Sequence, residues 1–269
     1  MHESDERAGN VQGSWLRAAS KILQYVADTQ MGRITAASEI CADAIESGGL
    51  VHLFGTGHSR IPVEEMFPRY GSYPGFNPIV ELSMTFHTQV TGPNGQRQAM
   101  FIERVEGLAD QILANYSFGD SDAMIIYSSG GSTAVPIEMA MGARERGLKV
   151  IAVTSVKNSL AGDSGHSSGT RLLDHADIVI DLGIPPGDSL IEIDGPETRV
   201  GPGSTVSNIA ITNEIKVQTA VLLAERGALP PVLTSPAVVG AERSEELFDA
   251  AYREHSLRAA AVLAKPEQT

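Results

Sequence analysis

The chain of 269 residues has a single cysteine, Cys41, so it cannot form an internal disulfide bond. It also contains no run of about 18 apolar residues, the length needed to cross a membrane. The opening residues Met1–Glu6 are charged and acidic, unlike the start of a signal peptide. These absences predict a cytoplasmic protein with no membrane segment, in which Cys41 packs in the core.

Basic residues are scarce. There are 20 lysines and arginines against 33 aspartates and glutamates, which gives a net charge of −13. This charge repels nucleic acids and anionic membranes, so we expect neither as a partner. A small phosphorylated ligand is still compatible with it, because a helix N-terminus and hydroxyl groups act locally.

Two nucleotide-binding patterns are missing as well. The glycine-rich segment Ser128–Thr133 has no Walker lysine, which disfavours a nucleoside triphosphatase. The earlier turn Gly55–Arg60 lacks the Gly-x-Gly-x-x-Gly pattern of a dinucleotide site. The histidines show no metal-ligand spacing, so we expect no metal site and no cofactor.

The sequence does contain five short apolar runs, most of them without polar alternation, separated in several places by helical patterns. Such runs are typical of parallel strands buried on both faces, and the alternation predicts a three-layer α/β sandwich. We expect residues 1–12 to be disordered and residues 13–263 to form one domain with an N-terminal helical pair. The expected strands are Leu50–Phe54, Pro78–Leu82, Ala123–Tyr127, Val150–Thr154 and Ile178–Leu182. The expected later helices are Val63–Tyr70, Arg104–Tyr116, Thr133–Arg146, Ser204–Arg226 and Glu242–Leu263.

Glycines and hydroxyl residues follow two of the predicted strands. Ser128–Thr133 leads from one strand into a helix, and Gly55–Arg60 follows the first strand. Glycines let the backbone approach a ligand, and N–H groups at a helix start attract anions. Because the carboxyl ends of parallel strands meet at one edge, both turns are expected to border a single phosphate-binding crevice.

These two turns resemble those of the sugar isomerase (SIS) family of phosphosugar-binding proteins. The matching segments are Gly55-Thr56-Gly57-His58-Ser59 and Ser128-Ser129-Gly130-Gly131-Ser132-Thr133, followed by Lys149–Thr154 and the strand near His175–Ile180. The segment Asn213–Gln218 resembles one subfamily. The resemblance implies a five-stranded flavodoxin-like sheet and a homodimer or homotetramer. It assigns the sugar phosphate to Ser128, Ser129, Ser132 and Thr133, with Gly57, Ser59 and Arg60 contacting the ligand from the first turn.

Two adjacent glutamates, Glu64 and Glu65, follow the first turn. Adjacent residues on a helix point about 100° apart, so only one can face a ligand. The surrounding segment resembles the Ala-Glu-Glu-Leu segment of sedoheptulose 7-phosphate isomerase, which implies that Glu65 is the catalytic residue. That enzyme has a zinc-binding histidine where this chain has Ile61, which again predicts no metal. The structural alternative is a solvated helix face or an ion pair with a nearby arginine.

Four further residues are candidates. Glu214, on the long predicted helix, is a second possible catalytic carboxylate, and its alternative is an intersubunit ion pair. His58 lies inside the first turn, where it is a candidate catalytic residue or a turn-stabilising one. Glu81, at the end of the second predicted strand, and His87, just beyond it, are candidates for substrate binding or for ordinary loop positions.

Removal of the proton at C2 of a sugar phosphate can lead to two reactions. Reprotonation at C1 gives aldose–ketose isomerisation, whereas loss of a C3 substituent gives elimination. A pair of carboxylates such as Glu65 and Glu214 suits elimination. We therefore favour a metal-independent lyase acting on an N-acetylated amino-sugar 6-phosphate such as N-acetylglucosamine 6-phosphate. The alternatives are a phosphosugar isomerase and a non-catalytic phosphosugar sensor.

Overall fold

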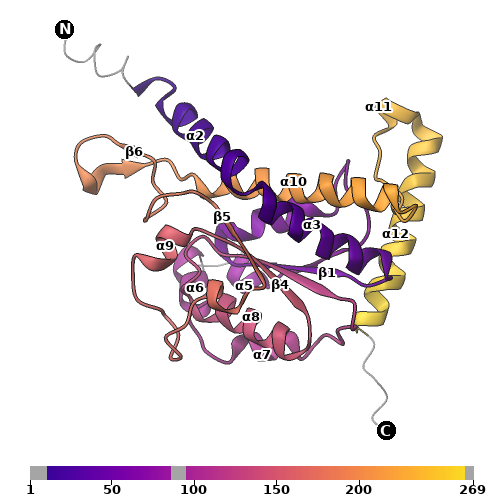
Figure 1. Ribbon diagram of the computed structural model, residues 1–269, viewed down its shortest axis with the longest axis horizontal. Helices are drawn as coiled ribbons and strands as arrows, with labels where there is room; N and C mark the ends of the chain where they lie inside the picture. Colours follow the sequence, from indigo (N-terminus) through magenta and orange to yellow (C-terminus); the bar gives the residue numbers. More distant parts are fainter. Residues whose placement is uncertain (1–10, 86–94, 264–269) are drawn as a thin grey trace.

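A computed structural model describes residues 11–85 and 95–263. Five parallel strands form one sheet in the flavodoxin-like order β2-β1-β3-β4-β5. The strands are β1 (Val51–Gly55), β2 (Phe76–Ile79), β3 (Ala123–Tyr127), β4 (Lys149–Thr154) and β5 (Ile178–Asp181). Helices cover both faces of this sheet (Figure 1), so the predicted three-layer sandwich is confirmed.

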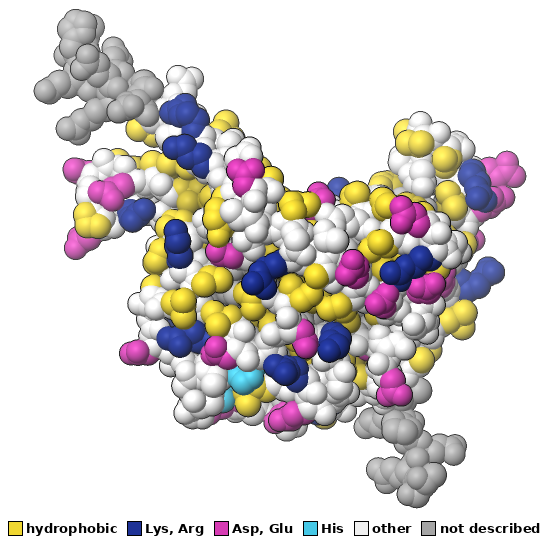
Figure 2. All heavy atoms as spheres, in the orientation of Figure 1, with side chains coloured by type: hydrophobic (Ala, Val, Ile, Leu, Met, Phe, Trp, Pro, Cys, Tyr) yellow, Lys and Arg dark blue, Asp and Glu magenta, His cyan; other side chains and the backbone are white. Residues whose placement is uncertain are grey.

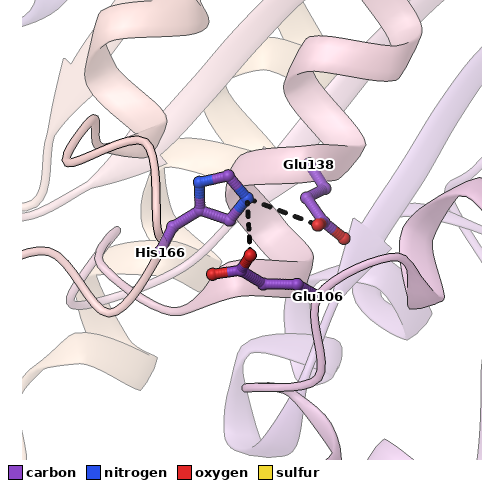
Figure 3. A group of neighbouring side chains, drawn as sticks. All are labelled: Glu106, Glu138 and His166. Carbon is purple, nitrogen blue, oxygen red and sulfur yellow. Dashed lines mark hydrogen bonds and ion pairs between the residues drawn. The ribbon is translucent and has the colours of Figure 1, made fainter.

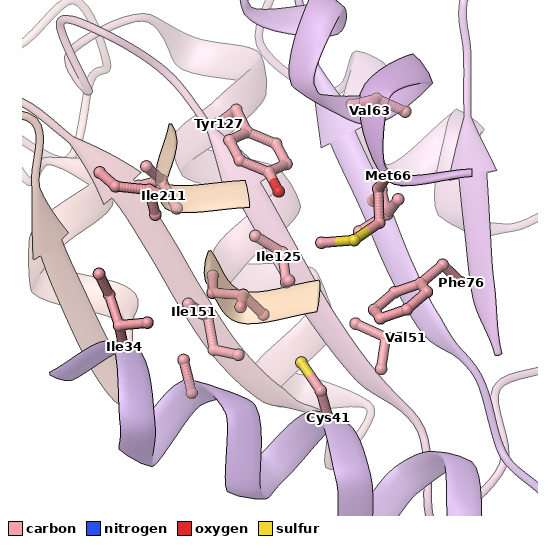
Figure 4. Packing of buried hydrophobic residues seen from close by; sticks show 14 of the residues in the cluster. Ile34, Cys41, Val51, Val63, Met66, Phe76, Ile125, Tyr127, Ile151 and Ile211 are labelled. Atoms are coloured by element: carbon pink, nitrogen blue, oxygen red, sulfur yellow. The ribbon is translucent and has the colours of Figure 1, made fainter. Parts of the chain in front are cut away.

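The core is divided into two clusters because successive strand residues point to opposite faces of the sheet. Ile125 and Tyr127 of β3 lie in the cluster that α3 (Met31–Glu46) and α10 (Ser204–Glu225) cover, as Figure 4 shows. The intervening Ile126 lies in the cluster covered by α7 (Leu108–Leu113) and α8 (Ala134–Glu145). Burial on both faces explains why the strands contain so few polar residues.

Further elements surround this sandwich. The helices are α4 (Ile61–Met66), α5 (Leu82–Thr85), α6 (Gly95–Ile102), α9 (Val156–Leu160), α11 (Pro236–Val239) and α12 (Ala241–Leu263). The N-terminal α2 (Ser14–Thr29) extends beside the small hairpin of β6 (Ile191–Glu192) and β7 (Arg199–Val200) in Figure 1. Trp15 Nε1 joins them by donating to the carbonyl of Pro202 at 3.1 Å.

Acidic and basic side chains are interspersed over the face shown in Figure 2, so the negative charge is not gathered into one patch there. Among the described residues, no helix combines the length and apolar character that a membrane crossing requires.

Several predicted elements have different bounds in the structure. The helix predicted at Val63–Tyr70 lies at Ile61–Met66, because the backbone is already extended at Phe67. The second strand, predicted at Pro78–Leu82, lies at Phe76–Ile79, because Phe76 points into the core while Leu82 is 69% exposed and begins α5. The predicted helix Arg104–Tyr116 is interrupted at Gly107, whose φ of 85° places it before α7. Residues 103–106 consequently form a connection between helices.

The C-terminal helix α12 is attached to the sandwich by polar and aromatic contacts. Arg258 Nη1 donates to the carbonyls of Ile45 and Gly49, both at 2.8 Å. His255 packs on Phe67 with ring centroids 4.8 Å apart, and its buried Nδ1 has no hydrogen-bond partner among the described residues. Burial, together with the Arg258 charge, lowers the pKa of His255 below its ordinary 6.5.

Acidification should therefore loosen α12. Because the folded protein binds the His255 proton more weakly than the unfolded chain does, this contribution to stability is complete above pH 6.5 and is lost as the pH falls below it. We expect His255→Phe to reduce the loss of unfolding free energy between about pH 7.5 and about pH 5.5, measured by urea titration. His175, whose pKa burial also lowers, leaves a residual slope. An unchanged slope in the variant would assign the acid sensitivity to other groups.

Candidate functional site

The loop Ser128–Thr133 joins β3 to α8 and packs closely against the end of β4. Gly131 has a φ of 59°, a conformation that favours glycine, and a Cβ there would lie 2.7 Å from Thr154 Oγ1. The hydroxyl of Ser128 accepts from Gly131 N at 3.1 Å and so stabilises the turn. Thr133 is the residue before the first turn of α8, and its side chain does not cap that helix.

Most hydrogen-bond donors of this loop have no partner among the described residues. In the part of the chain that the structure describes, the N–H groups of Ser129, Gly130, Ser132 and Thr133 have no protein acceptor. The hydroxyls of Ser129, Ser132 and Thr133 likewise make no hydrogen bond to described residues. Donors gathered at a helix N-terminus form a site for an anion. The loop is therefore suited to hold a phosphate group.

The first turn lies beside this loop because β1 and β3 are neighbours, with Gly55 opposite Tyr127. Gly55 is required there, since a Cβ would come within 2.2 Å of the carbonyl oxygen of Ser59. The two turns border one cavity of about 750 Å³. Of the residues predicted to bind ligand, those lining it are Gly57, His58, Ser59, Ser128, Ser129, Ser132 and Thr133.

A carboxylate that the sequence did not single out also lines this cavity. Glu103 follows α6, and its Oε2 accepts from Thr56 Oγ1 at 2.6 Å. Burial raises the pKa of Glu103 above its ordinary value, although the Thr56 hydrogen bond and the nearby Arg104 act in the opposite direction. Its backbone carbonyl accepts from Val135 N in the first turn of α8, at 3.0 Å. A carboxyl group with a raised pKa beside a ligand cavity is a candidate general acid or base.

A second carboxylate that lines the cavity, Asp188, already accepts hydrogen bonds from the protein itself. Its Oδ1 accepts from the N–H groups of Gly203 and Ser204 at 2.9 and 2.8 Å, at the N-terminus of α10. The hydroxyl of Ser204 donates to its Oδ2. Asp188 thereby closes this helix terminus to other anions. The loop Ser128–Thr133, called the serine loop below, is the part of the cavity that is suited to an anion.

The predicted catalytic glutamates Glu64 and Glu65 do not line the cavity between the two turns. Glu64 is exposed on α4 and paired with Arg60, which is not among the residues that line the cavity. Glu65 is paired with Arg69 and accepts from Asn213 Nδ2 at 2.9 Å. Both glutamates border a separate groove, called the aromatic groove below after three of its lining residues, Tyr70, Phe248 and Tyr252.

Hydrogen bonding accounts for the charge state of Glu65. Burial acts to raise its pKa, but the contacts with Asn213 and Arg69 outweigh it and hold the pKa below the ordinary value. Glu65 is thus stabilised as a carboxylate, and its ion pair is one of the two structural alternatives considered for it.

Three other candidates also lie apart from the cavity or outside the described residues. Glu214 Oε1 accepts from Gln218 Nε2 at 2.8 Å, one turn along α10, and does not line the cavity. Glu81 lies two residues beyond β2, where its carbonyl accepts from Met84 N and Thr85 Oγ1. His87 falls outside the described residues. The structure thus brings the two predicted turns together and leaves the predicted glutamate pair away from them.

One group of described residues combines the side-chain types of a metal site. Glu106, Glu138 and His166 lie close together (Figure 3). The sequence predicted no metal ligands, because Ile61 stands where a zinc-binding histidine was looked for and the histidines show no ligand spacing. The three residues of this group are distant from one another along the chain.

Comparisons with known proteins agree with the resemblance drawn from the two turns. Residues 14–155 match the SIS domain family. A UPF0309 protein of Streptomyces coelicolor is 36% identical over 228 residues, which cover 85% of this chain and 89% of that protein. A UPF0309 protein of Halalkalibacterium halodurans is 34% identical over 223 residues, covering 83% and 90% of the two chains.

Among solved structures, the phosphoheptose isomerase of Neisseria gonorrhoeae aligns with a TM-score of 0.48 and 14% identity, over 82% of this chain and 98% of that one. The family match and the two relatives are sufficient to classify the protein. The chain belongs to the SIS domain family and, within it, to the UPF0309 proteins.

Proposed function

We propose that the cavity between the two turns binds a sugar phosphate and that Glu103 transfers a proton beside the sugar carbonyl. The observation that supports this best is a set of N–H groups and hydroxyls with no partner among the described residues, which line the same cavity as Glu103: those of Ser129, Ser132 and Thr133 and the N–H of Gly130. The volume of about 750 Å³ accommodates a phosphorylated hexose. The choice of a sugar as the group that carries the phosphate follows from membership of the SIS family.

The number of available carboxylates favours isomerisation over elimination. As a base, the Glu103 carboxylate takes the proton from C2, and the resulting carboxylic acid returns it to C1. The proton of the O2 hydroxyl passes to O1, directly or through a hydroxyl group that lines the cavity, so aldose–ketose exchange requires no second carboxylate. Elimination needs a second group to protonate the departing oxygen. Asp188 is engaged at the start of α10, and Glu65 and Glu214 do not line the cavity. We therefore prefer a phosphosugar isomerase to the lyase expected from sequence.

The reaction can be tested with glucose 6-phosphate and N-acetylglucosamine 6-phosphate in deuterated water, followed by NMR. Deuterium at C2 of the recovered aldose phosphate, together with a ketose phosphate deuterated at C1, supports isomerisation. An unsaturated sugar would instead support the lyase. If thermal stabilisation appears with no exchange and no product, the protein is a sensor, for which ligand at about 100 times Kd adds about 2.7 kcal/mol of stability.

Glu65 and Glu214 remain candidates through oligomerisation. We propose a homodimer or homotetramer, as the family resemblance implies, in which a second copy brings one of these carboxylates to the cavity. Mixing Glu103→Gln with Glu65→Gln subunits tests this arrangement. If the site is shared, the mixture regains up to about a quarter of the activity, since some sites then hold both intact residues. No regain would restrict catalysis to the residues of one chain.

The serine loop can be tested separately from catalysis. We expect Ser129→Ala to weaken the binding of phosphorylated sugars by about 1.5–3 kcal/mol, the worth of one hydrogen bond to a charged group. Binding of the corresponding unphosphorylated sugars should not change, because they place no anion in the loop. Isothermal titration of both ligand types measures the difference. Equal losses for both would mean that the Ser129 hydroxyl only shapes the turn.

A further inference from the structure

We propose that Glu106, Glu138 and His166 form a binding site for a divalent transition-metal ion. The three side chains come from different segments: Glu106 from the connection after α6, Glu138 from α8, and His166 from the loop after α9. One potential ligand atom from each lies within 4.8 Å of the other two. Figure 3 shows both carboxylates directed at the same imidazole edge.

The distances suit metal coordination. His166 Nε2 lies 3.3 Å from Glu138 Oε1 and 4.0 Å from Glu106 Oε2. Two ligands that bind one zinc ion at about 2.1 Å with tetrahedral angles lie about 3.4 Å apart. The Glu138 and His166 atoms are at this separation already, and Glu106 can close the remaining gap because its side chain is 42% exposed. The two carboxylates therefore need little movement to bind an ion together with Nε2.

Metal binding requires a change of tautomer at His166. In this structure Ser168 N donates to Nδ1 at 3.1 Å, which places the proton of the neutral ring on Nε2. A metal at Nε2 needs that proton on Nδ1, where Ser168 Oγ, 2.7 Å away, can accept it once the Ser168 N–H has turned away. A hydrogen-bond partner on the second nitrogen is the usual support of a metal-binding histidine. The side chain of His166 is only 9% exposed, so the orientation of its ring is fixed by packing.

Both carboxylates are also held in place by other donors. Glu138 accepts from Gly107 N with both oxygens, at 2.8 and 2.9 Å. Glu106 accepts from the N–H and the hydroxyl of Ser167 at 2.6 and 2.7 Å. Each oxygen has two lone pairs, so one remains available to a cation. One nitrogen and two oxygens favour zinc, manganese or iron(II) over magnesium or calcium, which prefer oxygen ligands alone.

A metal ion at this site would stabilise segments that lie next to the phosphate-binding cavity. Glu106 lies three residues after Glu103, and Glu138 lies on the helix that begins at the serine loop. The neighbour of His166, Gly165, donates from its N–H to the carbonyl of Ser132 at 2.7 Å. A bound ion would thus connect three segments that border the cavity, without contacting the ligand there.

Metal binding can be measured on the intact protein without any sugar. After removal of metal with a chelator and dialysis, titration with ZnCl₂ and separately with MnCl₂ is expected to show one saturable site per chain and a raised Tm. We expect His166→Ala, Glu138→Gln and Glu106→Gln each to weaken this binding by at least about tenfold. Glu145→Gln, an exposed residue near the end of α8, is the matched control and should bind as the wild type does.

Two results would contradict the metal site. Wild-type protein that binds neither ion saturably would show that the three residues are only a hydrogen-bonded clamp. Unchanged binding in Glu106→Gln, the most exposed of the three and the least disruptive to replace, together with His166→Ala would place the metal elsewhere. Because no sugar phosphate is needed, failure here is distinguishable from failure of the proposed function.

Discussion

Replacing Glu103 with glutamine is expected to lower the rate of C2 proton exchange by about 10²–10⁴-fold, the usual contribution of a general base. Glutamine keeps the shape of the side chain and can still accept from Thr56, which lies 2.6 Å from Oε2. The affinity for sugar phosphate should therefore be nearly unchanged. Exchange is measured by NMR in deuterated water and affinity by titration calorimetry, with Glu145→Gln as a control on α8.

The pH dependence of C2 proton exchange distinguishes a catalytic role of Glu103 from a structural one. Burial raises the pKa of Glu103 and the Thr56 hydrogen bond lowers it. The base acts as a carboxylate, so exchange should decline as the pH falls through a value above the ordinary 4.5. Thr56→Val removes the hydrogen bond and should move this decline to higher pH. Full exchange in Glu103→Gln, or an unmoved profile in Thr56→Val, would contradict the assignment of Glu103 as the base.

Replacing Gly131 with alanine is expected to reduce sugar-phosphate affinity by at least about 100-fold. The φ of 59° costs an L-residue about 1–2 kcal/mol. The new Cβ would also lie 2.7 Å from Thr154 Oγ1 and 3.2 Å from Ser159 Oγ, so the loop has to move. Movement misplaces several donors, each worth about 1.5–3 kcal/mol to a bound phosphate.

Two further variants distinguish a change in the geometry of the serine loop from a general loss of protein stability. Gly147 has a φ of 84°, and a Cβ there would meet no atom within 4 Å, so Gly147→Ala should lower the Tm and leave affinity intact. Adding Thr154→Ala to Gly131→Ala removes the closest contact and should restore part of the affinity. If Gly131→Ala binds the ligand as tightly as the wild type, the phosphate does not depend on this loop.

The apolar runs were sufficient to predict the sheet. Ala123–Tyr127 is fully buried and appears as β3 with the bounds expected from sequence. The serine loop and first turn were also predicted to meet, because the carboxyl ends of neighbouring parallel strands lie at one edge. The second strand was misplaced because apolar content alone does not distinguish the buried Phe76 from the exposed Leu82.

The carboxylates were harder to predict. Glu103 contacts Thr56 across 47 residues of sequence, a pairing that only the fold brings about. It lies just before the predicted helix Arg104–Tyr116, whereas in the structure a connection runs from Glu103 to Gly107 and α7 begins at Leu108. The spacing on α4 predicts that Glu64 and Glu65 point in different directions, but it does not predict whether either of them points toward the cavity. That choice depends on the packing of α4 against α10, where Asn213 contacts Glu65. The sequence also did not predict the group formed by Glu106, Glu138 and His166, because only the folded chain brings these residues together.

A structure of the protein crystallised with glucose 6-phosphate tests the central claim most directly. We predict the phosphate within about 3.2 Å of the backbone nitrogens of Ser129, Gly130, Ser132 and Thr133, with the sugar extending toward Glu103. Ligand density in the aromatic groove beside Glu65, with the serine loop empty, would contradict it.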